Sequence, residues 1–202
     1  SEVGIISNLS SNASKNKLHT VGVAVPDAEI KIVDSSGNGV LIGEIGEITC
    51  KSKASFSRYY GNKDSTQKSL KDGYFYTGDM GYMDEDNFLI FSSRKKEIII
   101  TGGTNVYPAD VEAILNQHPL VKETSVVGVE DQKLGEKVVA FVIPHKENAL
   151  TSRALQRHCM YNLADYQKPL GYIFVSEFPR TALGKILKRK LIDRYQAYLR
   201  HR

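Results

Sequence analysis

The chain has 202 residues, 41% of them hydrophobic, and a formal net charge of +4, so it can form one large domain or two small ones with packed cores. No apolar run approaches the roughly 18 residues that a membrane-spanning helix needs, and Cys50 and Cys159 are too few and too far apart for a disulfide framework. We therefore expect a globular, soluble protein of the cytoplasm, without a transmembrane segment.

Basic residues gather near the end of the chain. The group consists of Lys185, Lys188, Arg189, Lys190, Arg194, Arg200 and Arg202. Such a cluster favours an anionic partner, and a nucleotide, coenzyme A or nucleic acid would each fit it. Because no zinc-ligand spacing or aromatic-glycine RNA-binding motif accompanies the charge, we expect no nucleic-acid partner.

The first half of the chain has the pattern of short strands separated by turns. Strands are predicted at residues 21–25, 29–33, 47–50 and 87–92, and turns at residues 35–39 and 72–73. Ile30, Ile32, Ile45 and Ile48 alternate in part with polar residues, which predicts a sheet with one buried face and one wet face. Residues 8–17 are polar and without periodicity, so we expect a mobile loop there.

After residue 96 the pattern changes to mixed helices and strands. Residues 97–101 are a β-branched run, Pro108 suits the first turn of a helix that extends to about Gln117, and strands are predicted at residues 123–129, 138–143 and 173–176. Thr151 is placed to cap a second helix. The last helix has an apolar stripe made of Leu187, Leu191, Ile192, Tyr195 and Leu199. The chain is therefore predicted to be α+β, with a boundary at residues 94–96.

Lys185 ends the segment Pro179-Arg180-Thr181-Ala182-Leu183-Gly184-Lys185. Gly184 lets the backbone turn, and the flexible side chain of a lysine can then bring a compact positive charge into a cleft. Attack of a carboxylate on the α-phosphate of ATP needs such a charge, because the reactants repel each other and the transition state spreads negative charge over phosphoryl oxygens. The alternative interpretation is a surface lysine before a basic helix.

Two further motifs offer groups that suit a nucleotide. Asp79 ends the segment Tyr76-Thr77-Gly78-Asp79, and a carboxylate there can accept hydrogen bonds from both vicinal hydroxyls of a ribose. Arg94 begins the cluster Arg94-Lys95-Lys96, and its planar donor fork could bind ribose or phosphate oxygens. The alternatives are an ordinary turn for Asp79 and a surface arginine for Arg94.

The segment Gly102-Gly103-Thr104-Asn105 has no side chain at its first two positions. The backbone can therefore approach a thin substrate closely, and a pantetheine arm is such a substrate. The alternative is a tight turn between the β-branched run and the helix that begins at Pro108, and both interpretations can hold together.

Taken together, the order and spacing of these motifs resemble the C-terminal part of the AMP-forming acyl-CoA synthetase, adenylation-domain and luciferase superfamily. The resemblance covers nearly the whole chain. It implies that residues 1–95 are a small β-barrel-like subdomain that ends the large adenylate-forming domain, and that residues 96–202 are a compact α+β lid domain. Ser93 stands where the family usually has glycine, a small departure.

The resemblance also implies a role for each motif. Lys185 would be catalytic and bind the acyl carboxylate and phosphate, while Asp79 and Arg94 would bind the nucleotide. Lys96 would be the hinge between the domains. The other cofactor-binding positions would be Gly102 and Gly103 for pantetheine and Asn105 near the nucleotide phosphate. Glu2 would help to coordinate Mg²⁺ on the ATP phosphates, since a carboxylate oxygen is a suitable ligand.

The function implied is an ATP-dependent acid–CoA ligase whose cofactors are ATP/AMP, Mg²⁺ and coenzyme A. A carboxylic acid substrate attacks ATP to give acyl-AMP and pyrophosphate, and the sulfur of coenzyme A then displaces AMP. The chain lacks the family's phosphate loop and most of its acyl pocket, and it starts without a methionine. We therefore expect a C-terminal fragment that is inactive alone.

Two other functions fit the same residues. An adenylation domain would use the same first step but load the phosphopantetheine thiol of a carrier protein. A noncatalytic nucleotide-binding module could retain the fold without the reaction. The joint presence of Asp79, Arg94 and Lys185 favours an enzyme over this last alternative.

Overall fold

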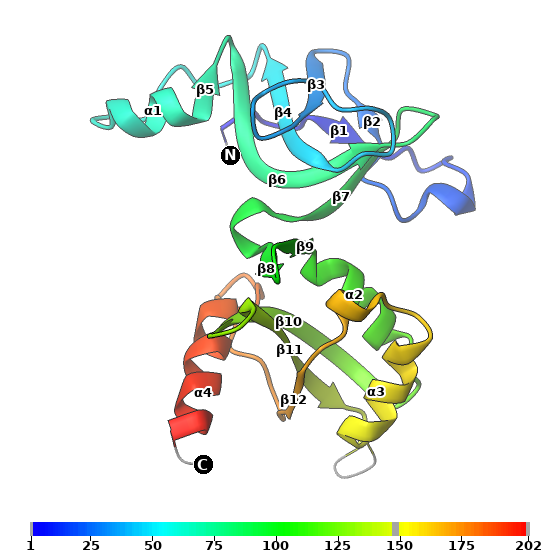
Figure 1. The fold of residues 1–202 in the computed structure, drawn as a ribbon. Helices are drawn as coiled ribbons and strands as arrows, with labels where there is room; N and C mark the ends of the chain where they lie inside the picture. The colour runs from blue at the N-terminus through cyan, green and yellow to red at the C-terminus, as the bar shows by residue number, and fades with distance from the viewer. Residues whose placement is uncertain (1, 147–149, 201–202) are drawn as a thin grey trace. The chain divides into compact units, whose positions relative to one another are not determined.

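The computed structural model describes residues 2–146 and 150–200 (Figure 1), so Ser1 and Arg202 lie outside the described residues. The chain divides into two compact units, Ser1–Lys96 and Glu97–Arg202. Each unit has its own sheet and its own buried apolar residues. The predicted α+β class is confirmed.

The first unit is built on a five-stranded antiparallel sheet. Its strands are β3 (Ala28–Val33), β4 (Gly46–Ser52), β5 (Leu70–Lys71), β6 (Tyr74–Met83) and β7 (Leu89–Arg94). β4 pairs with β3 and β6, and the long β6 also pairs with β5 and β7. Among the described strands β3 pairs only with β4, so the sheet is open. The subdomain, expected to be barrel-like, therefore does not contain a closed barrel over its described residues.

One face of this sheet is buried, as the partial alternation predicts, but the opposite face is not wet along β4, because Glu47 and Thr49 are buried there as well. Ile32, Ile48 and Leu89 form the buried cluster, and Ile30 packs against it. The predicted turn at residues 72–73 is confirmed, and it joins β5 to β6 as a two-residue hairpin loop. Apolar residues on neighbouring strands thus determine which side of the sheet faces solvent.

Two elements of this unit do not follow from local sequence patterns. β6 runs through Gly78 and Asp79, which are typical of turns, and it forms because β4 and β7 pair with its two edges. The helix α1 (Lys63–Ser69) has no buried residue. It begins at Asn62, whose side-chain oxygen accepts a hydrogen bond from the Ser65 N–H at 2.9 Å, a stabilising cap.

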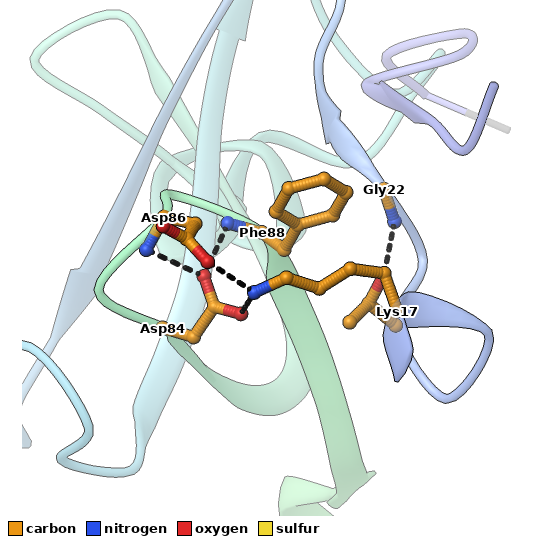
Figure 2. A network of polar contacts seen from close by, with 6 residues as sticks. Lys17, Gly22, Asp84, Asp86 and Phe88 are labelled. Atoms are coloured by element: carbon orange, nitrogen blue, oxygen red, sulfur yellow. Dashed lines mark hydrogen bonds and ion pairs between the residues drawn. The ribbon is translucent and has the colours of Figure 1, made fainter. Parts of the chain in front are cut away.

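Residues 8–17, expected to be a loop, contain the end of a short strand and a helical turn. β1 (Ser7–Asn8) pairs with β2 (Val23–Ala24), and residues Lys15–Lys17 form a 3₁₀ turn. The Lys17 ammonium lies 2.6 Å from Asp84 Oδ2, 2.6 Å from Asp86 Oδ2 and 4.7 Å from the centre of the Phe88 ring. Figure 2 shows its side chain extending to the two carboxylates. The segment is therefore anchored to the turn between β6 and β7.

The second unit is a three-layer arrangement around another five-stranded sheet (Figure 1). Its strands are β8 (Ile99–Thr101), β9 (Thr104–Val106), β10 (Val121–Asp131), β11 (Gly135–Pro144) and β12 (Gly171–Phe174). Its helices are α2 (Pro108–Asn116), α3 (Ser152–Met160) and α4 (Lys188–Arg200). The sheet order is β10-β11-β8-β9, and β12 pairs with β11 in parallel.

Alternation along β10 and β11 creates the layers of the second unit. Val126 and Val138 belong to one buried cluster together with Val111 and Leu115 of α2 and Leu155 of α3. The next residues along each strand, Val127 and Val139, point to the opposite face, where a second cluster includes Leu191 and Tyr195 of α4. The helices therefore cover both faces of the sheet, because successive strand residues point in opposite directions.

Local sequence signals predict where α2 and α3 begin. Pro108 is the first residue of α2, as predicted. Thr151 is the cap of α3, and its hydroxyl accepts a hydrogen bond from the Ala154 N–H at 3.3 Å. β12 begins two residues earlier than the predicted strand at residue 173. Within the described residues no helix is long and apolar enough to cross a membrane.

The anchor at Lys17 predicts a pH dependence of stability. The hydrogen bond from Lys17 lowers the pKa of Asp84 below its ordinary value. A lowered folded-state pKa stabilises the folded form above the ordinary carboxyl pKa of about 4, and this stabilisation is lost as the pH falls through the folded-state value. Asp84→Asn should therefore destabilise the first unit at pH 7, and the difference from the parent chain should shrink below about pH 4.

The measurement is urea unfolding followed through the NMR amide signals of residues 2–96. Glu85→Gln is the matched control, because Glu85 lies in the same turn and is exposed. A destabilisation by Asp84→Asn that stays constant down to pH 2 would contradict the assignment of this stability to the ion pair.

Candidate functional site

Asp79 and Arg94, which the sequence singles out in separate motifs, lie together in the structure. They are direct partners in the antiparallel pairing of β6 with β7. Arg94 Nε lies 2.7 Å from Asp79 Oδ1, and the side chains are 42% and 28% exposed. The pair thus combines a carboxylate and a guanidinium that are held against each other and are partly exposed, while Asp79 Oδ1 itself is buried.

The backbone that leads to Asp79 is held by side-chain hydrogen bonds. The Thr77 hydroxyl accepts a hydrogen bond from the Asp79 N–H at 3.0 Å and donates one to the Ile48 carbonyl at 2.7 Å. The Gly78 N–H donates to Glu47 Oε1 at 3.1 Å. These contacts fix the position from which the Asp79 carboxylate projects.

Glu47 also connects this backbone to the residue after Arg94. Its second oxygen, Oε2, lies 2.7 Å from the ammonium of Lys95, and the Glu47 residue is only 6% exposed. A single buried carboxylate therefore joins the Asp79 segment on β6 to the end of β7. Sequence reasoning missed Glu47, although an acidic residue inside an apolar strand run is a signal, because a buried charge needs partners.

Lys185 lies in a tight β-hairpin that precedes α4. The Leu187 N–H donates to the Pro179 carbonyl at 2.8 Å, and the Thr181 N–H donates to the Lys185 carbonyl at 2.8 Å. Gly184 has a φ of +85°, a conformation that glycine adopts without strain. The Lys185 residue is exposed, so its ammonium is available to a substrate.

Polar contacts connect both ends of this hairpin to β10 and α2 of the same unit. Arg180 pairs with Glu123 of β10 at 2.5 Å and 2.6 Å, and Lys188 pairs with Glu112 of α2 at 3.0 Å. From the sequence, Lys188 has no predicted role beyond its positive charge, and Arg180 has no predicted role. No local signal could identify these pairs, since their members are 57 and 76 residues apart in the chain.

Gly102 and Gly103 form the turn that joins β8 to β9. Both have positive φ, +55° and +80°, as a two-residue hairpin turn requires. Asn105 is exposed on β9, opposite Ile100 of β8. The structure thus brings these three predicted residues together on one hairpin, and the tight-turn interpretation of the paired glycines is confirmed.

Lys96 is exposed and lies in the 3₁₀ turn Lys95–Glu97, as the last residue of the first unit. This location at the division of the chain is the one that a hinge requires. Its role in a domain rotation stays a prediction.

Glu2 is held close to the surface of the first unit. The Tyr59 hydroxyl donates to Glu2 Oε1 at 3.0 Å, and the Phe56 N–H donates to the Glu2 carbonyl at 2.7 Å. Over the described residues no group of three or more histidine, cysteine, aspartate or glutamate side chains could hold a metal ion. A single carboxylate is still compatible with Mg²⁺, which proteins often bind through one or two carboxylates plus substrate phosphates.

Neither cysteine has the surroundings of a nucleophile. Cys50 and Cys159 are both buried. Burial raises the pKa of both thiols, whereas a reactive cysteine needs a lowered pKa.

Comparisons with known proteins find similarity over most of this chain. Residues 110–185 match the family described as the AMP-binding enzyme C-terminal domain. The long-chain-fatty-acid–CoA ligase of Salmonella typhimurium is 41% identical over 174 residues, which cover 86% of this chain and 31% of that protein. The fatty acid–[acyl-carrier-protein] ligase ScoC of Streptomyces coeruleorubidus is 37% identical over 178 residues, which cover 88% of this chain and 34% of that protein.

A solved structure is also similar to this chain. ATP-bound MatB from Rhodopseudomonas palustris matches with a TM-score of 0.91 and 30% identity, over 96% of this chain and 39% of that chain. The chain spans between 31% and 38% of the length of the curated relatives that it matches. Residues 110–185 therefore match the AMP-binding enzyme C-terminal domain family, and most of the chain is similar to a part of the long-chain-fatty-acid–CoA ligase and to a part of MatB.

Proposed function

We propose that this chain is the C-terminal part of an ATP-dependent acid–CoA ligase, which forms an acyl-AMP intermediate and then an acyl-CoA thioester. The observation that carries the proposal is the pairing of Asp79 with Arg94 in a chain that resembles a long-chain-fatty-acid–CoA ligase over most of its length. In this function Asp79, Arg94 and Lys185 act on ATP, and the hairpin of Gly102 and Gly103 serves the thioester step.

The Asp79 and Arg94 pair would hold the nucleotide by its ribose. Asp79 Oδ1 is buried beside Arg94 Nε, so Oδ2 of the carboxylate would accept hydrogen bonds from the ribose hydroxyls, and the Arg94 guanidinium has donors beyond the Nε that faces Asp79. Charge-assisted hydrogen bonds of this kind are about twice as strong as neutral ones. Because strand pairing already fixes both side chains, binding would require little reorganisation.

Lys185 would serve the first half-reaction. An oxygen of the substrate carboxylate attacks the α-phosphorus of ATP, and the bond to the bridging oxygen breaks to release pyrophosphate. Both reactants are anions, so a nearby ammonium lowers their repulsion and stabilises the charge that spreads over the phosphoryl oxygens. The exposed hairpin of Lys185 can present such a charge without burying it in the absence of substrate.

The second half-reaction would use another hairpin of the same unit. The thiolate of coenzyme A attacks the acyl carbon of acyl-AMP, a thioester bond forms, and AMP leaves. The turn at Gly102 and Gly103 has no side chains that would obstruct a pantetheine arm. A rotation of backbone torsions at Lys96 would exchange the Lys185 hairpin for this one between the two steps.

Mg²⁺ would bind the ATP phosphates, with Glu2 as one carboxylate ligand. When bound, the ion would offset phosphate charge. Asn105 would lie near the nucleotide phosphate in the same scheme. The cytoplasmic location expected from the sequence stays a prediction.

A carrier-protein thiol is the second candidate acceptor. The similarity to a fatty acid–[acyl-carrier-protein] ligase favours it, and a carrier delivers the same phosphopantetheine arm. The excess of basic residues near the end of the chain favours coenzyme A, whose nucleotide carries phosphates.

Replacement of Lys185 tests the adenylation role. In the intact enzyme that carries this chain, Lys185→Ala should slow acyl-AMP formation by roughly 10²- to 10³-fold, the usual effect of removing one transition-state charge stabiliser. The rate is measured as pyrophosphate release in the absence of thiol. Lys190→Ala removes an exposed lysine of α4 and is the control, and an unchanged rate for Lys185→Ala would refute the role.

The acceptor is identified from the product. Intact enzyme incubated with a carboxylic acid, ATP and coenzyme A should give acyl-CoA and AMP in equal amounts, detected by mass spectrometry. Acyl-AMP that accumulates with coenzyme A but is consumed when a phosphopantetheinylated carrier is added would instead assign the carrier-loading function.

A further inference from the structure

We infer that Arg180 is a positioning residue that determines where the hairpin holds the Lys185 ammonium. The inference rests on the proposed function and adds to it a residue that would act on the reaction only through Lys185. It is carried by contacts within the second unit alone.

The hairpin itself is a closed ladder of short-range hydrogen bonds. Arg180 and Ile186 face each other as an antiparallel bridge, and the Gly184 N–H donates to the Thr181 carbonyl at 2.9 Å. The Thr181 hydroxyl accepts from the Lys185 N–H at 3.1 Å. These bonds fix the shape of the hairpin, but they do not fix its direction relative to the sheet.

Arg180 connects the tip of the hairpin to strand β10 of the sheet. Its NH2 group contacts both carboxylate oxygens of Glu123, at 2.5 Å and 2.6 Å, and its NH1 group donates to the Gly184 carbonyl at 2.9 Å. One rigid guanidinium plane therefore joins β10 to the residue that precedes Lys185. A planar fork suits such a task because its donors keep a fixed angle to one another.

The opposite end of the hairpin is held by a second ion-pair network. Lys188, three residues after Lys185, lies 3.0 Å from Glu112 of α2 and 3.4 Å from Glu97. Glu112 in turn accepts a hydrogen bond from the Val126 N–H on β10 at 2.7 Å. Ile186, which packs against the buried cluster under α4, also holds the base of the hairpin. The Arg180 contact with the Gly184 carbonyl adds a connection closer to the tip.

The exposure of the Arg180–Glu123 ion pair indicates that it positions the hairpin more than it stabilises the fold. Its side chains are 39% and 35% exposed, and ion pairs at such exposure contribute little to the stability of a fold. A displacement of a reacting group by about 1 Å can cost roughly 10²-fold in rate. The same contact can therefore be nearly neutral for folding and still be needed for catalysis.

The test separates the two half-reactions in the intact enzyme. Arg180→Ala should slow acyl-AMP formation by roughly 10- to 100-fold, while formation of acyl-CoA from supplied acyl-AMP should keep the parent rate. Glu123→Gln should slow the same half-reaction less, and Arg180→Lys should restore part of the lost rate, because it keeps the charge without the planar fork. Arg157→Ala, which removes an exposed arginine of α3, should change neither half-reaction.

A comparison of variants distinguishes positioning from a structural effect. If Arg180 acts only through Lys185, the double variant Arg180→Ala/Lys185→Ala should form acyl-AMP no more slowly than Lys185→Ala alone. An additive loss in the double variant, or an equal loss in both half-reactions, would overturn the inference. If Lys185→Ala slows adenylation and Arg180→Ala does not, the inference fails while the proposed function stands. An unchanged rate for Lys185→Ala would instead refute the adenylation role, and with it this inference.

Discussion

The pairing of β6 with β7 is the constraint on which the nucleotide half of the site depends. Asp79 and Arg94 occupy directly opposed positions, and a slip of one residue would turn one of the two side chains to the other face of the sheet. The buried carboxylate of Glu47 stabilises this arrangement, because it holds the Gly78 N–H on β6 and the Lys95 ammonium after β7. Two side chains from separate motifs are thereby held together before any ligand arrives.

The second unit holds the flexible side chain of Lys185 at a defined place. Lys185 is exposed on a short hairpin, while β10 lies in a sheet whose two faces are covered by helices. Arg180 and Lys188 connect the hairpin to that rigid body through Glu123 and Glu112. Glu112 also accepts the Val126 N–H, so it satisfies a donor on a strand that pairs only with β11 among the described strands.

Local patterns predicted the parts of the structure that depend on neighbours in the chain. Pro108 begins a helix and Thr151 caps another, as their chemistry requires. β6 was missed because Gly78 and Asp79 resemble a turn and the strand exists through pairing with distant β4 and β7. The sequence predicts that Asp79 and Arg94 bind the same nucleotide, but their direct contact depends on strand register. Arg180 was missed because its partner Glu123 lies far away in the chain, and Glu47 was missed although its place in an apolar strand run is a signal.

The central claim is that the Asp79 carboxylate and the Arg94 guanidinium together bind the ribose of a nucleotide. The most direct measurement is calorimetric titration of AMP into the intact enzyme and into its Asp79→Asn and Arg94→Gln variants, with Asp64→Asn on the exposed helix α1 as the control. Each variant at the pair should weaken binding by roughly 10- to 100-fold, since hydrogen bonds to charged groups contribute about 1.5–3 kcal/mol. Equal AMP affinity in all four proteins, or none in the parent, would contradict the claim.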